Sequence, residues 1–364
     1  MEDKQPHFER PTTNRPPSLF NLTIITVIVA LLAGFGGAFL VKLVASPSQS
    51  GYFNFINTPQ DLKFSIDQPL TSLAVKNQNA VAGVYKEVAS ISSIGGPVFS
   101  AGDFLGSAVV VTSDGWLMTT KQVLNDSKGK IILGDKVYDI SQIKTDDFDN
   151  LVFIKIEENL LSPASFQLTD ELNIGEKLFT HIDLPNSYRN SLGIAFLQND
   201  HYVYDKYLYS DKLDYYLQFD SANKQLNSLG APYFNLDGYL LGIAYELDNQ
   251  ETVLIPAEYL KQSVKNLLNN TERVKLGLRY VDLENNSGFE KKGNLVFNPQ
   301  KAIDYNLPAY KAGLKVGDQI LAINNDAISA LRSLTSVIQN YRVGDKVIAK
   351  VLRVGIEMDI AIGL

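Results

Sequence analysis

The sequence predicts an all-β double barrel, followed by a smaller α+β domain and preceded by one apolar helix. From Ala80 to about Lys261, short runs rich in Val, Ile, Tyr and Phe alternate with Gly, Asn and Asp turns, a spacing typical of barrels rather than of βαβ units. Residues 273–364 add glycine turns, apolar strands and one stretch of helical apolar spacing. Residues 22–41 carry no charge, and about 20 apolar residues are enough to span a bilayer as a helix.

The amino-terminal part divides into a tail, an anchor and a linker. Residues 1–20 are polar and contain prolines, which indicates a tail without a packed core. Residues 21–44 are predicted to be a retained single-pass transmembrane helix, because a cleaved signal peptide has an apolar region of only about 7–15 residues. More Lys and Arg precede this segment than follow it closely, which favours a cytoplasmic amino terminus and an extracytoplasmic body. Residues 45–78 lack sustained periodicity and are predicted to link the membrane to the body.

Composition excludes several classes of function. The chain has 364 residues, a net charge of −7 and a pI near 5.1, so a nucleic-acid partner is not expected. It contains no cysteine, which removes disulfides, thiolate nucleophiles and Cys-based zinc sites. Its three histidines are scattered, and we expect no metal and no cofactor. The acidic cluster of Asp146, Asp147 and Asp149 is predicted to be a solvated loop, since it lacks the glycine turn and distal glutamate of a calcium loop.

Three segments carry motifs that resemble the signatures of one protease family. Residues 106–124 contain two apolar strands joined by a Ser-Asp-Gly turn, similar to the strand pair that ends in Thr-Asn-x-His-Val in the HtrA/Deg family of serine proteases. Residues 150–156 resemble that family's Asp-Leu-Ala-Val-Leu-Lys-Ile run, and residues 226–232 resemble its Gly-Asn-Ser-Gly-Gly-Pro run. The resemblance implies a trypsin-like, chymotrypsin-type barrel domain over residues 79–268.

The catalytic positions implied by this resemblance are altered. Gln122 stands where the family has its histidine, and Asn150 stands where it has its aspartate. Aligning the third run from its amino end places Ser228 at the nucleophile, whereas aligning it from its carboxyl end places Leu229 there. An amide does not titrate near neutral pH and cannot accept a hydroxyl proton. Loss of the base from such a triad costs about 2 × 10⁶ in turnover, so the sequence predicts a pseudoprotease with no intact catalytic residue.

Two other interpretations stay open from the residues alone. Ser228 could act with an unrecognised base such as Lys121 or Lys224, which would make the chain a working serine endopeptidase. The chain could also be a regulatory subunit of an active HtrA-like protease. His181 and His201 lie outside the three signatures and are predicted to be structural or exposed.

The carboxy-terminal part, residues 273–364, resembles an HtrA-type PDZ domain. The resemblance lies in residues 274–280 and in residues 308–324, with their glycine turns and apolar strand. Such a domain binds an extended peptide by strand addition and holds its terminal carboxylate with backbone N–H groups. A helix near residues 331–341 would form the second wall of the groove. The predicted peptide-binding residues are Lys275, Leu276, Gly277, Leu278, Arg279 and Tyr280 beside the groove strand, and Leu334, Val337 and Ile338 on the helix.

Together these features predict a membrane-anchored HtrA-like pseudoprotease of the cell membrane. Its PDZ domain would bind protein carboxyl termini or unfolded peptides, in extracytoplasmic protein quality control or regulation. The aromatic cluster Tyr52-Phe53-Asn54-Phe55 resembles aromatics that join three subunits in the family, which makes a homotrimer one prediction. Packing of this cluster on the chain's own barrel is the alternative, and hetero-assembly with an active HtrA-like protease is a further prediction.

Overall fold

The computed structural model describes most of the chain from residue 76 onward and part of an amino-terminal helix. The described residues are 20, 23–24, 26–34, 76–91, 96–124, 129–167, 172–182, 191–221, 229–284, 293–296, 303–329 and 332–364. The chain divides into two compact units, residues 1–64 and residues 65–364, and each unit is described by itself.

In the first unit, residues 23–24 and 26–34 are helical. Within the described ranges, no helix is both long and apolar enough to cross a membrane. The predicted tail up to residue 19, much of the predicted anchor, the linker up to residue 75 and the aromatic cluster lie outside the described residues. The anchor and the trimer contact therefore stay predictions.

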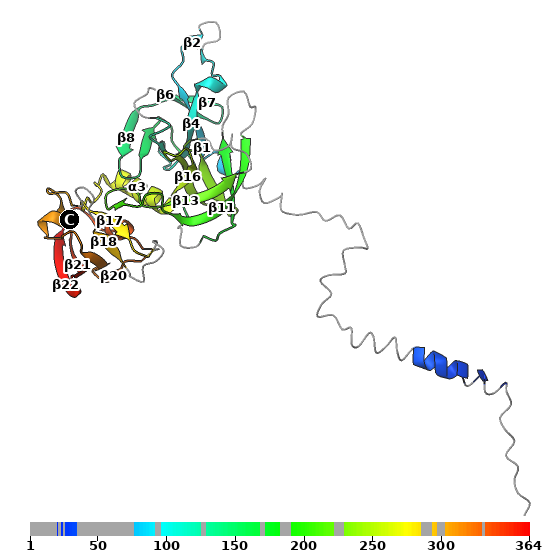
Figure 1. The fold of residues 1–364 in the computed structure, drawn as a ribbon. Coiled ribbons are helices and arrows are strands. Elements are labelled where there is room, and N and C mark those ends of the chain that lie inside the picture. Colours follow the sequence, from blue (N-terminus) through cyan, green and yellow to red (C-terminus); the bar gives the residue numbers. More distant parts are fainter. Residues whose placement is uncertain are drawn as a thin grey trace, which may run out of the picture. The chain divides into compact units, whose positions relative to one another are not determined.

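The second unit begins with a seven-stranded antiparallel sheet (Figure 1). Its central strands bury residues on both faces, whereas the edge strands β7 and β8 are largely exposed. This pattern fits a sheet whose middle is covered on both sides. The strands are β1 (Val81–Lys86), β4 (Phe104–Val110), β5 (Trp116–Thr120), β6 (Gly129–Leu133), β7 (Lys136–Asp139), β8 (Gln142–Asp146) and β9 (Leu151–Lys155), in the order β7-β6-β1-β4-β5-β9-β8. A short hairpin of β2 (Ser90–Ile91) and β3 (Gly96–Pro97) and the 3₁₀ turn η1 (Ala101–Asp103) connect β1 to β4.

Six further strands close into a barrel. They are β10 (Lys177–Ile182), β11 (Ser191–Tyr202), β13 (Tyr216–Ser221), β14 (Pro232–Asn235), β15 (Leu240–Glu246) and β16 (Thr252–Pro256), in the closed order β10-β11-β13-β16-β15-β14. The helix α3 (Ala257–Asn269) follows and ends at Asn270, which adopts the left-handed conformation that asparagine tolerates at a helix end. One apolar core joins this barrel to the first sheet. The sequence predicts a double barrel. The structure has one closed barrel, packed on a seven-stranded sheet whose edge strands β7 and β8 do not pair with each other in the part of the chain that is described.

A third sheet forms the carboxy-terminal part. Its strands are β17 (Arg279–Asp282), β18 (Asn294–Val296), β19 (Gln319–Ile323), β20 (Asp326–Ala327), β21 (Lys346–Arg353) and β22 (Ile356–Gly363), and its helices are α4 (Pro308–Lys311) and α5 (Leu334–Ile338). Exposed and buried residues alternate along β21, as expected for a strand with one face on a core. The helix α5 is shorter than the predicted 331–341 and begins at Ser333, whose Oγ caps it.

The edge of this third sheet is formed by a strand from elsewhere in the chain. The two-residue strand β12 (Leu208–Tyr209) belongs to the segment between β11 and β13, yet it pairs with β17 in antiparallel fashion. Leu208 is also a member of the carboxy-terminal apolar core. The barrel segment and the carboxy-terminal sheet therefore share one core.

Candidate functional site

Gln122, which the sequence resemblance places at the base position of the triad, is fixed by two backbone hydrogen bonds. Gln122 lies in the turn after β5, and its Nε2 donates to the carbonyl oxygen of Glu246 at 2.6 Å. The backbone N–H of Glu246 donates to Oε1 of the same amide at 2.9 Å. Because Glu246 ends β15, the amide joins the first sheet to the barrel. Both ends of the side chain are used for this contact, which an amide makes well because it carries a donor and an acceptor.

Asn150 and Asp149 lie just before β9 and contact different partners. Asn150 has a φ of 55°, and its carbonyl accepts the N–H of Lys121 at 2.9 Å. Asn tolerates this left-handed conformation better than most residues. The carboxylate of Asp149 is fully buried, accepts the Oγ–H of Ser263 at 2.6 Å and forms an ion pair with Arg273. The carboxylate of Asp149, next to Asn150, therefore contacts α3 and the segment after it.

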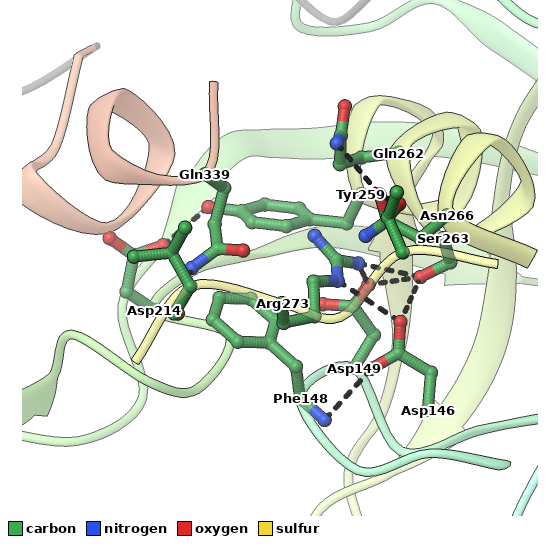
Figure 2. Close-up of polar contacts among 12 residues, drawn as sticks. Asp146, Phe148, Asp149, Asp214, Tyr259, Gln262, Ser263, Asn266, Arg273 and Gln339 are labelled. Carbon is green, nitrogen blue, oxygen red and sulfur yellow. Dashed lines mark hydrogen bonds and ion pairs between the residues drawn. The ribbon is translucent and has the colours of Figure 1, made fainter. Parts of the chain in front are cut away.

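Arg273 pairs with two acidic residues of the loop before β9, Asp146 and Asp149 (Figure 2). Its Nε lies 3.1 Å from Oδ2 of Asp146, and its guanidinium also pairs with Asp149 and stacks over the ring of Phe148 at 4.7 Å. Oγ of Ser263 also lies 2.8 Å from Oδ2 of Asp146. Burial, reinforced by the nearby charge of Asp146, raises the pKa of Asp149 to about 7, although Arg273 opposes the shift.

The prediction of a solvated acidic loop is wrong for two of its three members. Only Asp147 is exposed, where it pairs with Lys121, whereas the side chains of Asp146 and Asp149 are 12% and 0% exposed. The physical reason is the guanidinium of Arg273, because a buried carboxylate needs a paired charge. In the part of the chain that the structure describes, no cluster of His, Cys, Asp or Glu could hold a metal ion.

The loop that carries the predicted nucleophile position is described only from Leu229 onward, and Ser228 lies outside the described residues. The carbonyl of Leu229 accepts the N–H of Ser107 at 2.9 Å, and the N–H of Gly230 donates to the carbonyl of Ala244 at 2.9 Å. Gly230 has a φ of +74°, and a Cβ there would lie 2.2 Å from the Ser107 carbonyl oxygen. The end of this loop is therefore held between β4 and β15.

Of the lysines considered as bases, only Lys121 lies in the described part of the chain. Lys121 forms its ion pair with Asp147, and Lys224 lies outside the described residues. His181 lies in β10, with its ring edge-on to Phe179 at 6.0 Å. His201 lies in β11 and stacks on Tyr215 at 4.1 Å. Both histidines therefore pack against aromatic rings, as their positions outside the three motifs predicted.

A cavity of about 210 Å³ adjoins the former catalytic position. Asn150 forms part of its wall, together with Tyr245 and Leu247 after it in the chain. Most of the remaining wall comes from the segment 204–216, which also carries β12. Segment 204–216 thus lines the cavity beside Asn150 and also pairs, through β12, with the third sheet.

The predicted peptide-binding residues lie beside β17 and in α5. Leu276, Gly277 and Leu278 immediately precede β17, and Gly277 has a φ of +80°. Their backbone is held by Asp304 N–H to the carbonyl of Gly277 and by Ala309 N–H to the carbonyl of Leu276, both at 3.0 Å.

The helix residues named from the sequence serve the core rather than the groove. Leu334, Val337 and Ile338 are at most 1% exposed and belong to the carboxy-terminal core, whereas Lys275 is exposed. Arg279 and Tyr280 open β17, and Tyr280 is fully buried. The loop and strand residues thus lie together, whereas the three helix residues pack in the core. Peptide binding by either group stays a prediction.

Comparison with known proteins identifies the two parts. A PDZ-domain profile matches residues 274–364. A probable periplasmic serine endoprotease, DegP-like, of Bartonella henselae is 26% identical over 275 residues, which cover 71% of this chain and 52% of that protein. The serine endoprotease DegS of Haemophilus influenzae is 23% identical over 288 residues, which cover 76% of this chain and 81% of that protein. The chain is a relative of the HtrA/Deg proteases.

Solved structures agree on the fold. The HtrA-type protease AlgW with decapeptide superimposes with a TM-score of 0.59 at 20% identity, covering 80% of this chain and 97% of that one. The serine endoprotease from Yersinia pestis gives a TM-score of 0.53 at 20% identity, covering 80% of this chain and 96% of that one. The HtrA-like chain therefore has the trypsin-like barrel fold with a PDZ domain. It spans about half the length of the DegP-like relatives that it matches.

Some residues of the HtrA-like chain that define these sites were not found from the sequence. Arg273 is a single basic residue in the hinge after α3, and nothing local indicates its buried carboxylate partners. Asp211 receives the N–H groups of Leu276 and Gly277, and Thr335 contacts the same segment from α5. The signal that could have found Asp211 is the run Leu208-Tyr209-Ser210-Asp211, in which two polar residues end a short apolar strand.

Proposed function

We propose that this chain is a membrane-anchored HtrA-like pseudoprotease that binds peptides through its PDZ domain. The observation that carries the proposal is the paired hydrogen bonding of Gln122 with the backbone of Glu246. The side chain at the former base position acts as a clamp between two parts of the barrel domain, and an amide cannot take a proton from a hydroxyl.

The surrounding groups support the same conclusion. Asn150 replaces the carboxylate that would orient a base, and such a change alone costs about 10⁴ in turnover. Asp149, one residue earlier, is committed to Arg273 and Ser263. Leu229, one of the two candidates for the nucleophile position, has no hydroxyl. Without the triad residues, the turnover that remains comes from the oxyanion site and substrate binding alone, which give only about 10³–10⁴ over the reaction in water.

The binding part of the proposal rests on the PDZ domain. Its carboxylate loop is intact in backbone conformation, with Gly277 at positive φ and buried. PDZ domains use such backbone N–H groups to hold a terminal carboxylate. We place the bulk of the chain outside the cytoplasm, anchored by residues 21–44, because the uncharged run is long enough to span a bilayer and DegP-like relatives are described as periplasmic. Retention of the full-length chain in carbonate-washed membranes tests the anchor.

The enzyme question is tested by active-site labelling. Full-length protein is incubated with a fluorophosphonate probe and, separately, with an unfolded protein substrate. A Ser228→Ala variant is the matched control, and an active HtrA-type protease shows that the assay works. We expect neither labelling nor cleavage above the level of the control. Labelling or cleavage that disappears in Ser228→Ala contradicts the proposal and makes the chain a serine endopeptidase.

A further inference from the structure

The groove of the PDZ domain contains a segment of the barrel domain. Leu208 pairs with Tyr280 and Tyr209 pairs with Arg279 in antiparallel register. One residue further on, the N–H of Ser210 donates to the carbonyl of Leu278 at 3.0 Å. This is the main-chain pairing by which an extended peptide adds to a PDZ sheet.

A carboxylate occupies the place where a terminal carboxylate would bind. Oδ1 of Asp211 accepts the N–H of Leu276 at 2.8 Å, and both of its oxygens accept the N–H of Gly277 at 3.1 Å. The next N–H, that of Leu278, donates to Oγ of Ser210 at 2.9 Å. Three successive N–H groups of the carboxylate loop are thus satisfied by two residues of the barrel segment. Hydrogen bonds to an ionised acceptor are roughly twice as strong as neutral ones.

The side chains of the segment follow the two-residue period of a strand. Leu208 is 5% exposed and packs in the PDZ core, Ser210 is fully buried, and Tyr209 between them is 37% exposed. The guanidinium of Arg279 stacks over Tyr209 at 4.9 Å. From the opposite wall, Oγ1 of Thr335 in α5 donates to the carbonyl of Tyr209 at 3.2 Å. Both walls of the groove therefore contact the segment.

The segment is tied down beyond the groove as well. Asp214 accepts hydrogen bonds from Tyr259 of α3 at 2.5 Å and from Tyr280 of β17 at 3.2 Å. Because the segment is part of the same chain, it competes with a free peptide at a high effective concentration.

We propose that residues Leu208–Asp211 are an intramolecular pseudo-ligand, which a partner's carboxyl terminus must displace in order to bind. This proposal rests on the peptide-binding function proposed above and names its ligand class. In a displacing peptide, the main-chain carboxylate of a residue at the place of Ser210 takes the position of the Asp211 side chain. The ligand is then a free carboxyl terminus with a small last residue and an apolar residue two positions earlier, as Ser210 and Leu208 are.

The test measures peptide binding by the full-length protein. The probe is a fluorescent heptapeptide that copies residues 204–210 and ends in a free carboxylate, and its amidated form is the ligand control. Asp211→Ala removes the pseudo-carboxylate. Asp205→Ala is the matched control, because Asp205 is an exposed aspartate of the same segment outside the groove contacts. Since one charge-assisted hydrogen bond is worth about tenfold or more in a competition, we expect Asp211→Ala to bind the probe about tenfold more tightly than wild type. Asp205→Ala should match wild type, and amidation should abolish the gain.

Amide hydrogen exchange gives an independent readout. We expect the N–H groups of Leu276 and Gly277 to exchange about tenfold faster in Asp211→Ala than in Asp205→Ala. The milder variant Ser210→Ala should accelerate the Leu278 N–H and keeps the test valid if Asp211→Ala fails to fold.

The outcomes separate the two proposals. Equal probe affinity in wild type and Asp211→Ala, with equal exchange, overturns the pseudo-ligand and leaves peptide binding in place. If no variant binds the probe, the peptide-binding function fails. The exchange data then decide the pseudo-ligand alone, and unchanged exchange overturns it as well.

Discussion

The proposed pseudo-active site of the barrel and the proposed peptide groove of the PDZ domain differ in whether side chains or backbone groups would act. At the barrel site, side chains would carry the chemistry, and the two described positions that the HtrA resemblance assigns to the triad, Gln122 and Asn150, hold amides. At the groove, backbone N–H groups carry the recognition, and Leu276 and Gly277 still present theirs to a carboxylate. A single substitution removes a general base, whereas backbone recognition persists as long as the loop keeps its conformation.

The two sites are also filled in different ways. At the barrel site, Gln122 bonds to the backbone of Glu246, and we propose that this structural contact stands in place of a reactive group. In the proposed groove, residues 210–211 accept hydrogen bonds from the loop's own N–H groups, which would be exposed if they left. The first arrangement is fixed by residue identity, whereas we propose that the second contact is reversible. The experiments below test this difference, beginning with the residue that lies between the two sites.

The largest effect is expected from Arg273→Leu. Arg273 joins the carboxylate beside Asn150 to the hinge that leads into the carboxylate loop, and its side chain is 8% exposed. The change leaves Asp146 and Asp149 buried without their cation, which typically destabilises by about 3–5 kcal/mol. Urea unfolding of the purified protein measures this loss.

The matched control for this prediction is Arg332→Leu. Arg332 forms an ion pair with Asp326 in which the side chains are 56% and 39% exposed, so its loss should cost about 0–1 kcal/mol. If the two variants lose the same free energy of unfolding, the burial of the Arg273 ion pairs adds nothing to stability.

The second-largest effect is expected from Gly277→Ala, which tests whether the carboxylate loop depends on the left-handed backbone conformation of its glycine. Gly277→Ala places a side chain at a φ of +80° and a Cβ 2.5 Å from Cβ of Leu307. We expect a loss of about 2–3 kcal/mol in the free energy of unfolding and a loss of the carboxylate loop's amide protection. Gly313→Ala is the control, because its φ is +83° with nothing within 4 Å of the added Cβ. If both variants lose the same stability, the close approach of Leu307 contributes nothing.

The sequence predicts features that depend on neighbouring residues and misses those that depend on distant ones. The apolar alternation of β21 and the glycine of the carboxylate loop are local, so the PDZ fold and its loop could be predicted. Asp211 could not be predicted as the loop's ligand, because it lies 65 residues before Leu276 and reaches it only through strand pairing. Arg273 escaped for the same reason, since its partners lie more than a hundred residues earlier.

The smallest effect tests whether Gln122 is only a clamp. Gln122→Ala removes two hydrogen bonds at an exposed position, so we expect a loss of about 1 kcal/mol. Gln142→Ala, an exposed glutamine of the edge strand β8, should change stability by less than about 0.5 kcal/mol. Gln122→His restores an imidazole, yet fluorophosphonate labelling should not appear, because Asn150 cannot supply the orienting carboxylate and Asp149 is bound to Arg273. Labelling restored by this one change would mean that the barrel site, like the groove, is intact beneath its contact, and the contrast between the two sites would fail.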